Sequence, residues 1–251
     1  MNRIIVNRNR IDNYKDDEIE INNNKIWFYK DNKYEFEYID CDDVRLEFMI
    51  DNANIEILDY SSGNYLKIKN IYNIDNGSLR IDKFYNNKQV DEEIDFNLMQ
   101  DGDRIDYNFA TISLGEENYI INVNHNNKNT ISNIDNRSVA LKNSKINYTI
   151  NSRVLKDCVK SMLDQNTRII TLDECEAKIS PNMFIDLDDV IAKHGSVIGT
   201  FKEDQVFYLM SKGISYNDTV KLLIKGYLLS KIRVNVDVRM KIMEIIDRYW
   251  R

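Results

Sequence analysis

The chain has 251 residues, of which 43% are hydrophobic and 30% charged, and its formal net charge is −7 at pH 7. This length is enough for one large domain or two small ones, each with a hydrophobic core. The negative charge argues against broad binding to nucleic acids or to anionic membranes, and no apolar run reaches membrane length. We therefore expect proteins or small ligands as partners.

The N-terminal stretch and the cysteines favour a reducing cytoplasm. The first residues, "MNRIIVNRNR", are basic but lack the apolar core of a secretory signal. The three cysteines, Cys41, Cys158 and Cys175, are odd in number and show no CxxC spacing, so neither a disulfide framework nor a zinc site is indicated. We expect Cys158 and Cys175, which lie in strand-like sequence, to be small buried hydrophobes.

Up to about residue 186 the sequence consists of short segments with alternating apolar residues. Examples are "KYEFEYI", "VRLEFMI", "YLKIKNI" and "NYIINVN", with turn residues between them. This pattern is typical of an all-β solenoid, sandwich or barrel. Pro181 is the only proline, so Asn, Asp, Gly and Ser must form the turns, and we interpret the many Asn pairs as compositional bias.

After residue 200 the apolar period becomes helical. Residues 202–213 predict a short helix that Gly213 ends, because glycine adopts a left-handed conformation at low cost. Ser215 with Asp218 resembles a capping box and predicts the start of a second helix. "DVRMKIMEIIDRYW" predicts a third. The sequence therefore predicts a β-domain over 1–199 and a helical domain over 200–251. The apolar residues at helical spacing are Val206, Phe207, Leu209 and Met210, then Val220, Leu223, Ile224 and Tyr227, and then Val238, Ile242, Ile245 and Tyr249.

The usual enzyme signatures are missing from the sequence. There is no glycine-rich phosphate loop, GxSxG or HExxH motif, and neither His125 nor His194 lies near a nucleophile motif. We expect His125 to be a structural residue in a turn after a strand. The acidic group Asp186, Asp188 and Asp189 is better explained as a solvated strand end than as a cation site.

His194 has two interpretations from its own surroundings. Imidazole is a common metal ligand and can complete an iron–sulfur site, and the small neighbours Ala192, Gly195 and Ser196 would let a partner or cluster approach. The alternative, which these residues alone favour, is a surface histidine in a glycine-containing turn.

The segment from Ser180 to Leu228 resembles the C-terminal region of the SufB/SufD family of iron–sulfur cluster assembly proteins. That region has a proline and a strand, an acidic pair, a small-x-His-Gly run, a "FYL" helix, a "KGI" break and a helix that ends in "GY". The matches are Pro181, Asp188, Asp189, Val190, Ala192, His194, Gly195, Gly199, Phe207, Tyr208, Leu209, Gly213, Ile214, Gly226 and Tyr227. Weaker similarity extends upstream to about residue 120.

The resemblance implies a fold and a role. The fold is a right-handed parallel β-helix followed by a small C-terminal α-helical domain. The role is that of a non-catalytic scaffold whose helical domain docks SufC, an ABC-type ATPase, and whose β-helix pairs with a SufB-like subunit or a second copy. A transient iron–sulfur cluster or iron would be shared with the other subunit. The residues that the resemblance places at the ATPase-binding surface are Phe207, Tyr208, Gly213, Ile214, Leu223 and Tyr227.

The chain departs from the SufB branch of that family and is closer to SufD. By ungapped count, SufB has a cysteine where this chain has Asn166 and a glutamate where it has Gly195. The "AKHG" run fits the SufD pattern, which leaves His194 as the one candidate ligand. The chain is also shorter at its N-terminus than the family usually is. Two other functions stay open, a β-helix enzyme acting on polysaccharide and a purely structural interaction module.

Overall fold

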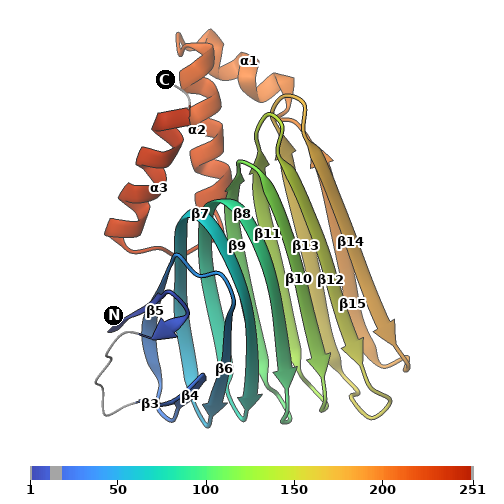
Figure 1. Ribbon diagram of the computed structural model, residues 1–251. Coiled ribbons are helices and arrows are strands. Elements are labelled where there is room, and N and C mark those ends of the chain that lie inside the picture. The colour runs from blue at the N-terminus through green and yellow to red at the C-terminus, as the bar shows by residue number, and fades with distance from the viewer. Residues whose placement is uncertain (1, 12–18, 250–251) are drawn as a thin grey trace.

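A computed structural model of the protein describes residues 2–11 and 19–249, and its fold is mainly β. Strands form 61% of it as a β-solenoid of about six turns, with three helices at the C-terminal end (Figure 1). The predicted fold class, a β-solenoid followed by helices, is confirmed.

The strands follow one another with short turns. The first are β1 (Asn2–Asn7), β2 (Arg10–Ile11), β3 (Ile19–Asn22), β4 (Lys25–Phe28), β5 (Asn32–Ile39) and β6 (Val44–Asp51). The middle ones are β7 (Asn54–Asp75), β8 (Ser78–Leu98), β9 (Arg104–Ser113) and β10 (Glu116–His125). The last are β11 (Ile131–Ala140), β12 (Lys145–Val154), β13 (Ser161–Thr171), β14 (Glu176–Ile185) and β15 (Val190–Gly199).

Parallel pairing of these strands builds two ladders that enclose the core. One ladder runs β1, β5, β7, β8, β9, β11, β13, β15, and the other runs β4, β6, β7, β8, β10, β12, β14. The long strands β7 and β8 belong to both, because each bends from one ladder into the other. Since parallel strands in register place the same face inward, buried side chains stack from one turn of the solenoid, here called a rung, to the next. Aromatic rings do so at Phe48, Tyr72 and Phe96, with centroids 4.4 and 5.3 Å apart.

Asparagine and glycine make the corners between strands. Several turn residues have positive φ without being glycine, among them Asn52, Asn76 and Asn143, and asparagine tolerates this conformation better than most residues. Glycine is required where two backbone segments approach closely: a Cβ at Gly115 would lie 2.1 Å from the carbonyl oxygen of Lys88. The turns are therefore built from the residue types that the sequence predicted.

The two ends of the solenoid differ. At the N-terminal end the short strands β2 and β3 pair antiparallel with β1 and β4, and the first-rung side chains of Ile4, Val6 and Phe28 are fully buried. At the C-terminal end β14 pairs only with β12 and β15 only with β13. We call this last rung the open end.

Three helices follow the last strand, and two of them, α2 and α3, cover the outside of the first ladder. The three helices are α1 (Glu203–Ser211), α2 (Tyr216–Leu229) and α3 (Val236–Tyr249). Gly213 has φ of 84° after α1, and the Ser215 side chain accepts a hydrogen bond from the Asp218 backbone N–H, as the sequence predicted. Among residues 2–11 and 19–249, no helix has the length and apolar content needed to cross a membrane.

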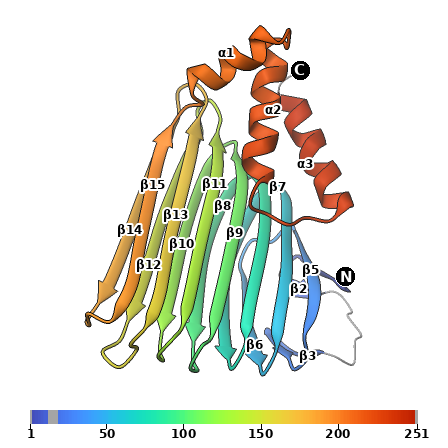
Figure 2. The same cartoon turned by 180° about the vertical axis from the view of Figure 1, so that it is seen from behind.

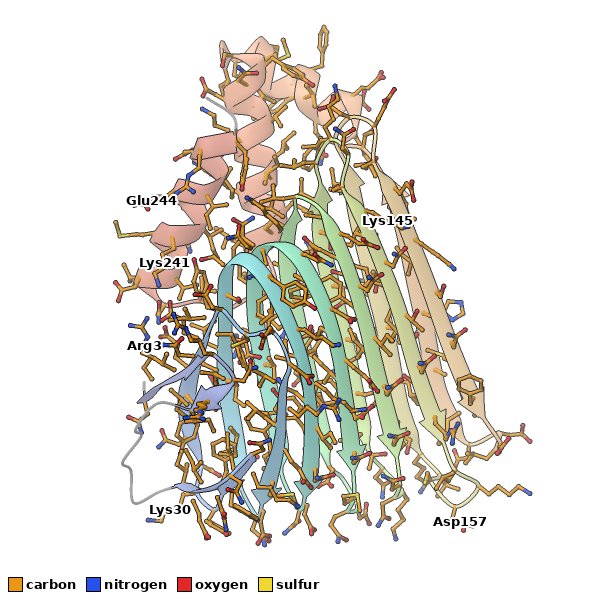
Figure 3. All side chains as sticks on the ribbon, viewed as in Figure 1. Arg3, Lys30, Lys145, Asp157, Lys241 and Glu244 are labelled. Carbon is orange, nitrogen blue, oxygen red and sulfur yellow. The ribbon has the colours of Figure 1, made fainter. Side chains whose placement is uncertain are left out.

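Helices α2 and α3 pack on the solenoid while α1 projects from it (Figure 2). Ile224 and Leu228 of α2 and Ile242 of α3 are completely buried, in a cluster that includes Phe84 and Ile112 on the outer face of the strands. No residue of α1 is buried. Charged contacts add to this packing lower on α3, where Lys241 pairs with Glu37, which also binds Arg3 (Figure 3).

The C-terminal end of α2 is fixed to the solenoid by Arg137 of β11. Its guanidinium donates to the carbonyl oxygen of Tyr227 at 3.2 Å and to Ser230 Oγ at 2.6 Å, and it lies over the Tyr227 ring. The Tyr227 hydroxyl in turn donates to the carbonyl oxygen of Arg168 on β13. A cation at the C-terminal end of a helix also interacts favourably with its exposed carbonyl groups.

Candidate functional site

The open end presents two unpaired strand edges side by side. Glu176 donates its backbone N–H to Ser144 beside β12, at 2.9 Å. In a parallel strand the backbone N–H and C=O groups of successive residues point alternately to the two neighbouring strands. Since Glu176 faces β12, Pro181 of β14, an odd number of residues later, faces the free edge. Proline is tolerated there, since the N–H that it lacks has no ladder partner within this chain. The free edge of β14 therefore lacks one donor at its centre.

His194 lies in the middle of β15, at the open end. It is in register with Gln165 of β13, which is 2% exposed and points into the solenoid, whereas His194 has no further rung above it and is exposed. In a parallel pair of strands, one of two registered residues directs its backbone N–H and C=O groups to the partner strand, and the other directs them away from it. His194 is of the second kind, so its backbone faces the free edge. The turn that one interpretation of the sequence placed here is wrong: Gly195 and Ser196 are strand residues too.

The chain itself provides no second soft ligand beside His194. Its nearest neighbours on the same face of β15 are Ala192 and Ser196. Among the described residues, no three His, Cys, Asp or Glu side chains come together as a metal site. An iron or cluster bound here would thus have one ligand from this chain.

The cysteines lie elsewhere, and two of them are in turns rather than in strands as we expected. Cys158 is buried in the turn before β13, where its Sγ donates to the carbonyl oxygen of His125 at 3.1 Å. Cys175 is partly buried in the turn before β14, and Cys41 is buried near β1. Burial raises the pKa of the Cys41, Cys158 and Cys175 thiols, which disfavours the thiolate that binds metals. Cys158 is buried as predicted, and Cys175 only partly so.

Apolar side chains surround the strand edges of the open end. Ile198, in register with the buried Ile169, is 47% exposed, and Phe184, Ile191 and Val197 are exposed to a similar degree. On β14 the inward-facing residues Ile179, Met183 and Ile185 are only partly buried. The core of the solenoid is therefore open at this end, which is a typical feature of an interaction surface.

Two acidic turns bound the open end. The turn between β13 and β14, here called the 173–176 turn, carries Asp173, Glu174 and Glu176, and all three are exposed. The turn between β14 and β15, here called the 186–189 turn, carries the exposed residues Asp186, Asp188 and Asp189. The two turns lie at opposite ends of the last strands (Figure 1).

A second exposed apolar surface lies on the helices. Phe207 and Tyr208 of α1 are 76% and 61% exposed, although the helix brings them close to the solenoid. Phe207 lines a groove of about 560 Å³ between α1, α2 and the solenoid, with Phe201, Val206, Tyr216 and Val220 among its other apolar residues. Gly213 and Ile214 form the break between α1 and α2.

Three of the residues predicted for the ATPase-binding surface, Ile214, Leu223 and Tyr227, are half-buried. Leu223 is half-buried on α2. Tyr227 is also half-buried, with its ring near Phe201 and its hydroxyl bonded to the Arg168 carbonyl oxygen. The structure thus brings Phe207 and Tyr208 together on α1 and separates them from Tyr227.

His125 is a core residue rather than the turn residue that the sequence predicted. It ends β10 and is completely buried, with Nδ1 2.7 Å from Thr130 Oγ1 and Nε2 2.9 Å from Ser132 Oγ. Burial lowers the pKa of the His125 imidazole to about 4. Its structural role agrees with the prediction, but its position does not.

The interior of the solenoid contains ionisable groups that the sequence did not single out. Lys83 is fully buried, pairs with Glu92 and lies among the rings of Tyr85, Tyr107 and Phe109. Burial lowers the pKa of Lys83 and raises that of Asp59 to about 7. These residues come together only because successive rungs of the solenoid stack, so no local sequence signal could have revealed them.

A further buried carboxyl lies one rung closer to the open end. Glu117 has no exposed surface and accepts hydrogen bonds from the Tyr119 hydroxyl at 2.8 Å and from Thr111 Oγ1 at 3.2 Å. Burial raises its pKa to about 7. Because Glu92 and Glu117 lie inside the core, a polysaccharide chain has no access to this carboxyl pair.

Comparison with known proteins gives one family. The family model described as "SUF system FeS cluster assembly, SufBD core domain" matches residues 50–227, so the similarity begins well upstream of residue 120. The iron–sulfur cluster assembly protein SufD of Bacillus subtilis is 28% identical over 135 residues, 53% of this chain and 31% of that protein. SufD of Escherichia coli is 33% identical over 66 residues, 26% of this chain and 15% of that protein. The matched part is therefore less than a third of either relative.

Proposed function

The chain belongs to the SufBD family of SUF-system iron–sulfur cluster assembly proteins and is SufD-like, and from this we propose that it is a non-catalytic scaffold subunit. It pairs with a second SufB- or SufD-like subunit through the open end, and it binds a SufC-type ABC ATPase through the helices. The nascent cluster is cargo of the complex rather than a resident cofactor.

The observation that carries the proposal is the position of His194 on an unpaired edge strand. A strand with free N–H and C=O groups is a template for pairing with another chain. The backbone of His194 faces that edge, and its side chain lies on the uncovered last rung with small neighbours on either side. A partner strand added to β15 would therefore lie next to the imidazole.

The chemistry of His194 fits a shared ligand. A neutral imidazole nitrogen binds iron, whereas the other ligands of a cluster are usually thiolates. Since Ala192 and Ser196 offer no thiolate, this chain contributes one nitrogen ligand and the partner contributes the rest. The role of His194 is to complete a site that exists only in the paired complex.

The exposed surface of α1 supports the proposed contact with the ATPase. Phe207 and Tyr208 form an apolar surface on a helix with no buried residue, beside the groove that Phe207 lines. Aromatic side chains in such a position are typical of the energetically dominant residues of interfaces. Gly213, Ile214 and Leu223 continue this surface toward α2. Tyr227 contributes indirectly, because it holds α2 on the solenoid.

Co-expression tests the two contacts separately. The chain, tagged at one terminus, is co-expressed with a SufC-type ATPase and, in a second culture, with a SufB-type subunit. We expect both proteins to co-purify with the chain. Phe207→Ala should lower only the amount of ATPase that is retained, and Ile198→Asp only the amount of SufB-type subunit. Failure of the intact chain to retain either protein would refute the proposal.

Anaerobic reconstitution tests His194. The pair formed with the SufB-type subunit is loaded with iron and sulfide, and the cluster is followed by its visible absorption. We expect His194→Ala to lower cluster retention while the pair itself stays intact by size-exclusion chromatography. Cluster retention equal to that of the unmodified pair would show that His194 is not a ligand. The cytoplasmic location expected from the cysteine pattern stays a prediction.

A further inference from the structure

The buried cluster of Asp59, Lys83 and Glu92 has the groups needed for a covalent reaction within the chain. We propose that Lys83 Nζ and Asp59 Cγ join in an amide cross-link between β7 and β8, with Glu92 carrying the protons. The structure holds the unreacted state, in which Lys83 pairs with Glu92. This inference does not depend on the proposed partners, because all three groups lie inside one chain.

The two side chains to be joined lie opposite each other on neighbouring strands (Figure 1). Asp59 of β7 is in register with Lys83 of β8, and both point into the solenoid, where they are 1% and 0% exposed. Parallel strands lie about 4.8 Å apart, a distance that the flexible four-carbon stem of lysine spans. Asp59 Oδ1 has no hydrogen-bond partner among the described residues, so no donor there competes with the amine for this oxygen.

Glu92 is placed to carry protons for the reaction. Its carboxylate pairs with the Lys83 ammonium and accepts a hydrogen bond from the Tyr85 hydroxyl at 3.3 Å. A carboxyl that acts as a general acid and base must lie within hydrogen-bond reach of the proton that it moves, and Glu92 meets this condition at Lys83 Nζ. Three aromatic rings enclose the amine at 4.5–5.2 Å, those of Tyr85, Tyr107 and Phe109.

Burial shifts both reacting groups toward their reactive forms. It lowers the pKa of the Lys83 ammonium and raises the pKa of the Asp59 carboxyl to about 7. The nucleophile in amide formation is the neutral amine, and a protonated carboxyl accepts its attack more readily than a carboxylate does. The cluster therefore favours the two protonation states that the bond requires.

The reaction balances without any co-reactant. Lys83 transfers one proton to Glu92, and the Nζ lone pair then attacks Cγ of the protonated Asp59 carboxyl. Glu92 donates a proton to the departing Asp59 hydroxyl, which leaves as water, and takes another proton from Nζ. One N–C bond replaces one C–O bond, nothing is oxidised or reduced, and Glu92 ends as a neutral acid.

Two physical effects favour the product. Groups that a fold holds side by side react as if at an effective concentration of about 10⁵ M or more. The core also exchanges a buried ion pair, which is unfavourable to desolvate, for a neutral amide that needs only hydrogen bonds. The cross-link ties together β7 and β8, the two strands that belong to both ladders, and by closing a loop it restricts the unfolded chain.

Mass spectrometry of the purified, unfolded chain tests the bond directly. We expect the intact mass to lie about 18 Da below that of the sequence, which is the mass of one water. Protease digestion should yield one branched peptide in which residues 59 and 83 are joined. The full sequence mass, with Asp59 and Lys83 in separate linear peptides, would overturn the proposal.

Variants of Asp59 and Glu92 test the role of each group. Asp59→Asn keeps the reaction but releases ammonia, so the loss measured on the branched peptide should become about 17 Da. Glu92→Gln removes the proton carrier and should slow bond formation at least about a hundredfold. Asp59→Asn leaves Lys83 and Glu92 in place, so the test stays decisive even where Glu92→Gln does not fold. An unchanged loss of water in both variants would overturn the proposal.

Two controls exclude other sources of the same mass change. The chain has one Asp-Gly pair, Asp101-Gly102, where cyclisation to an imide also releases water, and Asp101→Ala should keep the loss. Lys69→Met removes a lysine that pairs with Glu93 across the same two strands near the surface, and it should keep the loss as well. Lys83→Met should abolish it. A loss that disappears in Asp101→Ala would contradict the cross-link. No other protein takes part in these measurements, so the proposed function and the cross-link can fail separately.

Discussion

The hydroxyl group of Tyr227 on α2 donates a hydrogen bond of 2.7 Å to the carbonyl oxygen of Arg168 on β13. The same strand is the only neighbour of β15, on which His194 lies. The helix that carries the proposed ATPase-binding surface is thus bonded directly to the strand beside the open end. Arg137 fixes the same point from β11, so the helices and the last rungs share one junction.

Loss of this junction should loosen the helices without unfolding the solenoid. We expect Arg137→Ala to lower the free energy of unfolding by about 1–3 kcal/mol, because it removes the charged hydrogen bonds to the Tyr227 carbonyl oxygen and Ser230 and one of the partners of Asp135. Hydrogen exchange followed by mass spectrometry should show faster exchange in α2. The control is Arg239→Ala on the exposed side of α3, and an equal increase in exchange there would contradict this account.

The buried carboxyl of Glu117 should make the protein less stable as the pH rises from about 4.5 to about 7. In this window the folded state holds a proton on Glu117 that the unfolded state has lost, so the free energy of unfolding falls with pH. The full effect is about 3 kcal/mol from a shift of this size. Glu117→Gln should remove it, which urea unfolding at several pH values can measure.

The matched control for this pH dependence is Glu116→Gln, since Glu116 is the exposed neighbour on the same strand. Asp59 acts in the same direction as Glu117, and the pKa of His125, lowered to about 4, acts oppositely below pH 6.5. The quantity to compare is therefore the difference in pH dependence of the free energy of unfolding between Glu117→Gln and Glu116→Gln. Identical pH profiles for Glu117→Gln and Glu116→Gln would contradict the prediction.

The buried pair of Lys83 and Glu92 should show strong coupling. Lys83→Met is expected to cost about 3–5 kcal/mol, because it leaves Glu92 and Asp59 in the core without a cation. The double variant Lys83→Met, Glu92→Gln should be more stable than Lys83→Met alone. Lys33→Met serves as the control, because its partner Glu56 is exposed and the expected loss is below about 1 kcal/mol. Additive losses in chemical unfolding would refute the coupling.

Two glycine variants should shift stability in opposite directions. Gly115→Ala places a Cβ 2.1 Å from the Lys88 carbonyl oxygen, so we expect a loss of about 2 kcal/mol or more. Gly226→Ala lies inside α2 with open space around it, and alanine should stabilise the helix by about 0.5–1 kcal/mol. Thermal unfolding can compare both with the unmodified chain. A stable Gly115→Ala protein would show that the turn adapts.

The aromatic surface of α1 should matter for binding and not for folding. Because Phe207 is 76% exposed, Phe207→Ala is expected to change the melting temperature little while it weakens binding of the ATPase at least about tenfold. Met240→Ala on α3, which removes an apolar side chain that is 58% exposed, is the control for general surface effects. Calorimetric titration can measure both. Equal losses for the two variants would place the contact elsewhere.

Local signals were enough to predict the helices and many of the strands. The Ser215 cap and the left-handed Gly213 depend on neighbours in sequence, and both are present as predicted. Strand β15 has a weak signal: "VIAKHGSVIG" holds two glycines, and its β-branched residues lie only near its two ends. It is a strand because β13 offers it a full set of pairing partners, which only the folded chain provides.

Helical spacing also left undetermined what each apolar face contacts. The family resemblance grouped Tyr227 with the partner-binding residues, but this side chain is half-buried between α2 and the solenoid. In the same way, part of the asparagine content interpreted as bias has a structural role. Asn122, Asn151 and Asn182 donate side-chain hydrogen bonds from one rung to the next, at 2.7–2.9 Å. Asparagines that recur about once per rung are the sequence signal for such a ladder.

At the N-terminal end of the described chain the strands β2 and β3 are short and antiparallel to their neighbours, whereas β14 and β15 at the other end are parallel edge strands of ten residues each. Contacts that join unlike ends repeat indefinitely and produce fibres, whereas contacts between like ends stop after one association step. In the described part of the chain the longest parallel edges lie on the last rung. Strand addition there joins like ends, so that an exposed parallel β-edge, normally an aggregation hazard, leads to a complex of two.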